Sequence, residues 1–265
     1  MPDNNQFAIK KRVIAANQTR KITRAMELVA SSRLQRSKAR LAQHSLWLQH
    51  LQMAAACLSD AYFEPRLKAG AGKPSAYIVF GGSKGLSGYY SPAVFQYALP
   101  HTQEQTVLAV GSAAALFFHD ALRIPDSEAP SEACTCEIFQ AALKLYEAGA
   151  VAAVYMIYAK GSKHTVQQLL PLERVGERQQ TPILLEPSGQ VLYPALYREY
   201  LRALVHEAHL HAFLAEQVAR VSTMDSATQN ADDIIQSLQA TYNRMRQSSI
   251  TQEIITVSNA ARGDG

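Results

Sequence analysis

Glycine and proline are confined to the middle and the extreme ends of this chain. All thirteen glycines and eleven prolines lie at the tips or between residues 65 and 194, so residues 3–64 and 195–262 contain neither. Because these two residue types most often end a helix, both stretches are predicted to form very long helices. At about 1.5 Å of rise per residue, each helix would extend on the order of 90 to 100 Å. Helices of this length must pack outside a small domain, and the obvious partner of each is the other.

The chain therefore divides into three segments. Residues 1–64 are predicted to form an N-terminal coiled-coil helix, residues 65–192 an α/β domain, and residues 193–265 a C-terminal coiled-coil helix. With a folded domain joining their inner ends, the two helices should run antiparallel. The alternative is two separate amphipathic helices that pack on the middle domain.

The charge distribution is strongly uneven. Residues 1–40 contain ten Lys and Arg against two Asp and Glu, a net charge of +8, while the whole chain carries only +4. The first long helix is therefore a basic rod. Such a rod attracts nucleic acid, an anionic membrane surface or an acidic protein surface, and charge alone does not choose among them.

Apolar residues in both long helices recur at steps of three and four, which is typical of a helix that packs on another helix. In the first helix these positions form two groups, Ile9, Val13 and Ala16 and then Ile22, Met26 and Val29. In the second they are Leu238, Tyr242 and Met245, followed after a shift in phase by Ile250, Ile254 and Val257. We expect these side chains to line the contact between the two helices.

The middle segment alternates between strand and helix patterns. Short apolar runs at residues 76–80, 107–110 and 151–158 are predicted strands, and residues 137–147 are a predicted helix. This order indicates a small α/β domain with crossover connections and at least partly parallel strands. The sequence GGSKGLSG at residues 81–88 follows the first strand, but it matches neither GxxxxGK[ST] nor GxGxxG. A structural turn is the favoured interpretation, with nucleotide binding as the alternative.

Few residues of the sequence are arranged in patterns typical of catalysis or metal binding. His206, His209 and His211 are close enough in sequence for two of them to share a metal, but HExxH is absent and a solvated helix face is favoured. Serine-nucleophile, paired-carboxylate and CxxC patterns are also absent. We expect no catalytic residues, no metal and no cofactor. No run of about 20 apolar residues or secretory signal is evident, so a soluble, cytoplasmic protein is expected.

Both long helices carry segments that resemble one known family. Residues 17–34, NQTRKITRAMELVASSRL, are similar to the N-terminal signature NTxKITKAMxMVAxxKL of the gamma subunit of F-type ATP synthases. MDSATQNADDII at residues 224–235 and NRMRQSSITQEI at residues 243–254 resemble that family's MxxATDNAxxLI and NKARQxxITxEI segments. SKGLSG after the first strand resembles DRGLCG. The resemblance spans essentially the whole chain and is strongest at its ends.

The resemblance implies a central rotor shaft. Its antiparallel coiled coil would lie in a hexamer of alpha and beta subunits, and its Rossmann-like α/β domain would face the epsilon subunit and the membrane ring of c subunits. The chain would be a non-catalytic subunit, peripheral at the cytoplasmic face of the inner (plasma) membrane, in contact with the membrane only through the ring. A basic coiled-coil nucleic-acid binder is the alternative, although such proteins usually place their cations on a free helix that faces a groove.

The resemblance also implies roles for particular residues. Those aligned with contacts to the catalytic hexamer are Arg24, Met26, Glu27, Arg246, Gln247, Thr251 and Glu253. Met26 could equally be simple helix packing. Tyr200 aligns with a tyrosine near the ring, and Arg202 lies nearby where the family often has acidic character. Gly81, Gly82, Lys84 and Ser87 depart from the family pattern, so contact with epsilon is less firmly implied than contact with the hexamer.

Overall fold

The computed structural model describes residues 3–62, 73–119, 121–124, 129–172, 186 and 188–263, with the side chains of residues 3–5, 57–62 and 260–263 left out. The chain forms two compact units. One comprises Met1–Ala30 and Val221–Gly265, and the other comprises Ser31–Arg220. The expected boundary at residues 64 and 65 lies outside the described residues.

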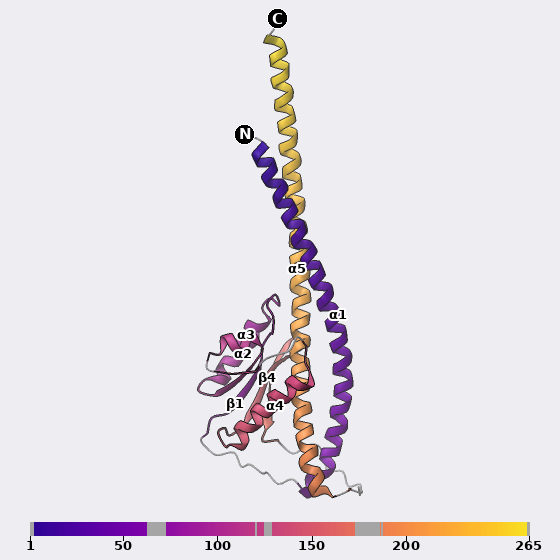
Figure 1. Cartoon of the computed structure of the whole chain (residues 1–265), viewed down its shortest axis with the longest axis vertical. Helices are drawn as coiled ribbons and strands as arrows, with labels where there is room; N and C mark the ends of the chain where they lie inside the picture. The colour runs from indigo at the N-terminus through magenta and orange to yellow at the C-terminus, as the bar shows by residue number, and fades with distance from the viewer. Residues whose placement is uncertain are drawn as a thin grey trace. The chain divides into compact units, whose positions relative to one another are not determined.

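Two long helices dominate the element order. Helix α1 spans Asp3–Tyr62 and helix α5 spans Gly189–Gly263 (Figure 1). Helix α5 begins four residues before the range expected for the second long helix, so Pro194 lies inside it. The Ser188 carbonyl accepts hydrogen bonds from the N–H groups of Val191 and Leu192, which starts the helix ahead of the proline. The prediction of two very long helices is confirmed.

In the smaller unit, α1 and α5 pair in antiparallel fashion. The Thr23 and Thr228 hydroxyl oxygens lie 2.7 Å apart, and Arg20 Nη1 donates to Asp232 Oδ1 at 2.9 Å. Moving forward along α1 from Arg20 to Thr23 thus means moving backward along α5. The predicted antiparallel coiled coil is confirmed, and its contact includes polar as well as apolar side chains.

The predicted contact positions are partly wrong. Ile22 and Val29 are 60% and 54% exposed, whereas Thr23 and Ala30 are 8% and 1% exposed. The sequence interpretation followed the largest apolar residues, but the steps of three and four continue from Ala16 through Arg20 to Thr23. Small side chains at Thr23 and Ala30 suit positions where two helix backbones approach closely.

The predicted contact positions of the second helix are also only partly correct. Leu238, Tyr242 and Met245 are half-buried as expected. Ile250, Ile254 and Val257 are 47%, 63% and 69% exposed, and no described residue of α1 covers them. Their apolar pattern therefore does not mark a helix–helix contact among the residues that the structure describes.

The larger unit contains a five-stranded sheet with the order β3-β2-β1-β4-β5. Its strands are β1 (Ala76–Phe80), β2 (Thr106–Val110), β3 (Leu122–Ile124), β4 (Val154–Lys160) and β5 (Lys163–Leu170). Strand β5 alone pairs antiparallel, through a hairpin at Gly161. The three expected strands are confirmed, although the third begins at Val154. Strand β3 was not predicted, because it is very short.

Helices cover both faces of the sheet. Helices α2 (Tyr90–Thr102) and α3 (Ser112–Phe117) pack on one face, and α4 (Glu132–Glu147) packs with α5 on the other (Figure 1). Helix α4 begins five residues before its predicted start because the Ser131 hydroxyl caps it by accepting from the Cys134 N–H at 3.2 Å.

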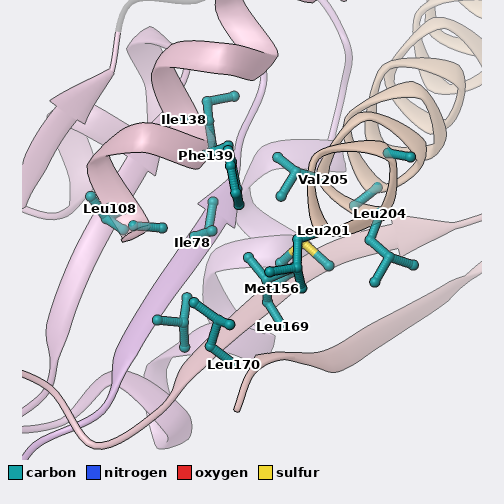
Figure 2. Close-up of a cluster of buried hydrophobic side chains, with 14 of the residues drawn as sticks. Ile78, Leu108, Ile138, Phe139, Met156, Leu169, Leu170, Leu201, Leu204 and Val205 are labelled. Atoms are coloured by element: carbon teal, nitrogen blue, oxygen red, sulfur yellow. The ribbon is translucent and has the colours of Figure 1, made fainter. Parts of the chain in front are cut away.

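The larger core joins the long helices to the sheet. Ile138 and Phe139 of α4 lie near Ile78 of the sheet and the α5 residues Leu201 and Val205 (Figure 2). The α1 residues Leu48, Leu51 and Ala55 belong to the same cluster. The inner parts of both long helices therefore form part of the hydrophobic core of the α/β domain.

Replacing Leu201 by alanine tests this arrangement. Leu201 is fully buried, so Leu201→Ala should lower the free energy of unfolding by about 2–5 kcal/mol through lost contacts and a residual cavity. Val191→Ala, at a position on the same helix that is 62% exposed, should change it by less than about 0.5 kcal/mol. Urea unfolding followed by the fluorescence of Trp47, the single tryptophan, measures both. Equal losses in the two variants would contradict the packing described.

Candidate partner-binding site

The first predicted hexamer-facing group lies on α1 in the smaller unit. Arg24 Nη1 donates to both carboxylate oxygens of Glu27, at 2.9 and 3.0 Å. The Arg24 side chain is 58% exposed, whereas that of Glu27 is only 15% exposed. Met26, which lies between them in sequence, is half-buried. The helix thus presents a guanidinium whose orientation is set by a carboxylate three residues away, and the Met26 thioether lies on another side of the helix, because residues two apart do not face each other.

The second predicted group lies on α5 and is fully presented to solvent. Arg246, Gln247, Thr251 and Glu253 are all exposed. The Thr251 hydroxyl donates to the Gln247 carbonyl at 2.9 Å, so its oxygen remains able to accept from a partner. Exposed Ile250, Ile254 and Ile255 are interspersed with these polar groups, which gives the surface an amphipathic character.

The structure does not bring the two groups together. Arg24 directly follows Thr23 of the Thr23–Thr228 contact, and Glu27 lies about one helical turn from it. Gln247 is nineteen residues further along α5 than Thr228, which at about 1.5 Å per residue is roughly 28 Å. The smaller unit thus offers two separate contact surfaces rather than one site.

Tyr200 and Arg202, the residues predicted to lie near a ring, belong to the larger unit. Tyr200 is 7% exposed, and its burial, with the nearby Glu207 carboxylate, raises the pKa of its hydroxyl. Arg202 forms a two-pronged ion pair with Glu199, at 2.7 and 3.1 Å, and that hydrogen bonding raises the pKa of its guanidinium. Arg202 is the more accessible of the two, and ring contact by either residue stays a prediction.

The three histidines of HEAHLH contact different neighbours. His206 Nδ1 lies 2.8 Å from the Thr135 hydroxyl oxygen, the His209 ring lies against Phe80, and the His211 ring stacks on Tyr158. Within the described part of the chain, no group of three or more His, Cys, Asp or Glu side chains could hold a metal ion. The predicted solvated helix face is wrong for His209, which is 3% exposed. The sequence did not show that these histidines face α1, α4 and the sheet.

One small cavity, of about 100 Å³, lies among α1, α4 and α5. Its lining residues are His44, Trp47, Glu132, Thr135, Glu199, Arg202, Ala203 and His206. The His44 and His206 rings meet edge to face at 4.7 Å, and His44 Nε2 donates to the Ala203 carbonyl at 2.8 Å. Burial, together with the nearby cationic or ionisable groups of His44, His209, Arg202 and Arg40, lowers the pKa of His206 to about 4. His206 is therefore neutral at physiological pH and contributes a hydrogen bond rather than a charge.

The glycine-rich segment after β1 uses its backbone groups internally. The Gly81 N–H donates to the Val110 carbonyl, the Gly82 N–H to the Ser91 hydroxyl, and the Gly82 carbonyl accepts from the Ala113 N–H, at 2.9–3.2 Å. A Cβ atom added at Gly81 would lie 2.7 Å from the Ala114 Cβ, so glycine is needed for close packing there. This geometry fits the predicted structural turn, because a phosphate-binding loop must keep its N–H groups available.

Long paired helices built into the core of an α/β domain define this chain as a coiled-coil protein with an α/β domain. A family model described as ATP synthase matches residues 5–262. The chain belongs to the ATP synthase gamma-chain family and is a non-catalytic, central-stalk subunit of that complex.

Curated relatives and solved structures agree with this assignment. The chain is 31% identical to an ATP synthase gamma chain of Alkaliphilus metalliredigens, with 96% of each chain covered. It is 29% identical to one of Ruminiclostridium cellulolyticum, with 97% of this chain and 98% of the relative covered. Its fold is similar to a chain from the OSCP/F1/c-ring structure of the Euglena gracilis mitochondrial ATP synthase, with a TM-score of 0.72 and 15% identity, covering 98% of this chain and 95% of that one. None of the helices in the described part of the chain contains an apolar stretch that could span a membrane.

The half-buried His206 predicts a pH dependence of stability. Its pKa is about 4 in the folded chain against an ordinary 6.5, so the unfolded chain takes up a proton first as the pH falls. The free energy of unfolding should therefore decrease between pH 6.5 and pH 4. Urea midpoints across this range should decrease less steeply for His206→Gln. His50→Gln, at an exposed position of α1, should keep the steeper slope, and an unchanged slope in His206→Gln would contradict the assignment.

Proposed function

We propose that this chain transmits rotation between an ion-driven membrane ring of c subunits and a catalytic hexamer of alpha and beta subunits. The observation that carries the proposal is the pair of surfaces on the smaller unit, one around the exposed Arg24 and one around the exposed residues from Arg246 to Glu253. Both surfaces lie in the segments that match the gamma-chain family. In this role the chain binds no nucleotide and performs no chemistry itself.

The basic face of α1 suits a rotating contact. The net charge of +8 in residues 1–40 attracts an acidic segment of the catalytic subunits at a range of about 10 Å without requiring a fixed geometry. Deeply buried apolar anchors would instead create one preferred angle and stop rotation there. Arg24 is a suitable cation for such a contact because Glu27 orients it and more than half of its side chain is exposed.

The second surface suits contacts that form and break in each step. Gln247 and Thr251 offer uncharged hydrogen bonds, each with a net stabilisation of about 1 kcal/mol. Arg246 and Glu253 add attraction at longer range. The shaft presents different faces to the three catalytic sites, so these differences in contact free energy shift the affinities of the sites for ADP, phosphate and ATP in turn.

The α/β domain is proposed to face the ring and the epsilon subunit. Arg202 would contribute to ring contact from α5, with Tyr200 supporting it from the core. The complex would place this chain at the cytoplasmic face of the inner (plasma) membrane, and the chain would reach the membrane only through the ring. A basic nucleic-acid binder is less well supported, because α1 is paired with α5 rather than free.

Assembly is the experiment that tests the proposal. The purified chain is mixed with alpha and beta subunits of the same source, and complex formation and ATPase rate are followed by size exclusion and a coupled assay. We expect one copy per hexamer and a stimulated rate. Absence of a complex, together with binding of random DNA that persists at physiological salt, would overturn the proposal in favour of a nucleic-acid binder.

Met26→Lys should weaken coupling of hydrolysis to transport. The variant adds a cation to an already basic face of α1, which strengthens attraction at one angle and hinders release. ATP-driven ion pumping per ATP hydrolysed should therefore decrease in the assembled complex. Met53→Lys is a matched control, because it makes the same change on α1 at a position that is 55% exposed and outside the proposed contacts. Unchanged pumping in Met26→Lys would refute the role given to this residue.

A further inference from the structure

A buried ion pair on α5 lies beneath the glycine-rich segment that follows β1. The side chains of Glu216 and Arg220, one helical turn apart, are 3% and 9% exposed and are hydrogen-bonded to each other. Arg220 Nη2 also donates to the Lys84 carbonyl at 3.1 Å and lies 3.4 Å from the Gly85 carbonyl. One guanidinium therefore connects α5 with the loop at residues 81–88.

This contact occupies the position where related sheets hold their ligands. Strand β1 is flanked by β2 on one side and β4 on the other, so the strand order reverses there, and ligands of such sheets bind outside the carboxyl ends of these strands. A Cβ atom added at Gly82 would lie 3.5 Å from the Glu216 carboxyl carbon. The Tyr90 hydroxyl, from the start of α2, donates to the Ala212 carbonyl of α5 at 2.9 Å. The chain's own helix therefore fills the crevice.

A buried ion pair is poor evidence for stability, because desolvation of both charges offsets their attraction. Its geometry is specific, however. A planar guanidinium that bonds a carboxylate and backbone carbonyls at fixed angles allows one register, whereas apolar contact is non-directional and permits sliding. The core that joins α5 to the sheet elsewhere is apolar, as at Leu201, Leu204 and Val205.

We propose that Arg220, oriented by Glu216, is a positioning residue that locks the loop at residues 81–88 to α5. Torque applied to the sheet then passes to the helix without slippage at the loop. The mechanical role rests on the proposed rotor function, whereas the lock itself does not. Arg220 acts through the loop and contacts no substrate.

Hydrogen exchange of the full-length chain tests the lock directly. In Arg220→Gln, the segment at residues 81–90 should exchange roughly ten-fold or more faster, because the loop loses charge-assisted hydrogen bonds. Arg220→Lys keeps one cationic donor and should show a smaller increase. Arg198→Gln is the control, because this α5 arginine forms an exposed ion pair with Glu147 of α4 and should leave the segment unchanged.

Glu216→Gln provides a second route if Arg220→Gln folds poorly. The amide can still accept from Arg220 but no longer supplies a charge, so we expect exchange between the rates of the native chain and Arg220→Gln. Native exchange rates at residues 81–90 in both Glu216→Gln and Arg220→Gln, or in whichever of them folds, would overturn the lock.

The assembled complex tests the mechanical role separately. Arg220→Gln should lose ion pumping per ATP hydrolysed while hydrolysis continues, and Arg220→Lys should recover part of it. Faster exchange with unaltered pumping would reject the mechanical role and keep the lock. Failure of the native chain itself to assemble with the hexamer would reject the rotor function, while the exchange result would still decide the lock.

Discussion

The two long helices cannot bury their apolar surfaces alone, and the rest of the structure follows from this constraint. A helix gains most of its stability from tertiary packing of one face. In the smaller unit α1 and α5 supply that packing for each other, through small and polar residues such as Thr23, Ala30 and Thr228. In the larger unit they pack into the core of the α/β domain through Leu48, Leu51, Leu201 and Val205.

The same constraint separates structural from binding residues. Side chains on the helix–helix contact are buried or half-buried, and those of the proposed hexamer contacts are mostly exposed, as at Arg24 and Arg246. Glu27 belongs to neither group alone, because its side chain is largely buried and forms an ion pair with the exposed Arg24. A shaft that must be rigid within itself and weakly bound to its surroundings needs this division, because directional bonds fix geometry and solvated charges attract without fixing it.

In the α/β domain, side chains of the chain itself occupy the position where sheets of this type hold ligands. Its sheet order is of the type that holds ligands at the reversal beside β1. Here Glu216 and Arg220 of α5 take that place, and the loop amides at Gly81 and Gly82 bond within the chain. This arrangement agrees with a non-catalytic subunit, and it explains why the glycine-rich loop lacks the phosphate-binding spacings.

The sequence by itself determined the two long helices, the α/β class of the middle and the gamma-chain family, because each depends on local signals: glycine and proline placement, strand composition and contiguous motifs. The contact positions were predicted only in part. Ile22 was expected inside and is exposed, while Thr23 is buried, because burial depends on where the partner helix lies. Only the tertiary structure decided that α5 enters the core, that His206 faces Thr135, and that Arg220 reaches the Lys84 carbonyl 136 residues away. Contacts between segments so distant in sequence leave no local pattern, since they are set by packing in three dimensions.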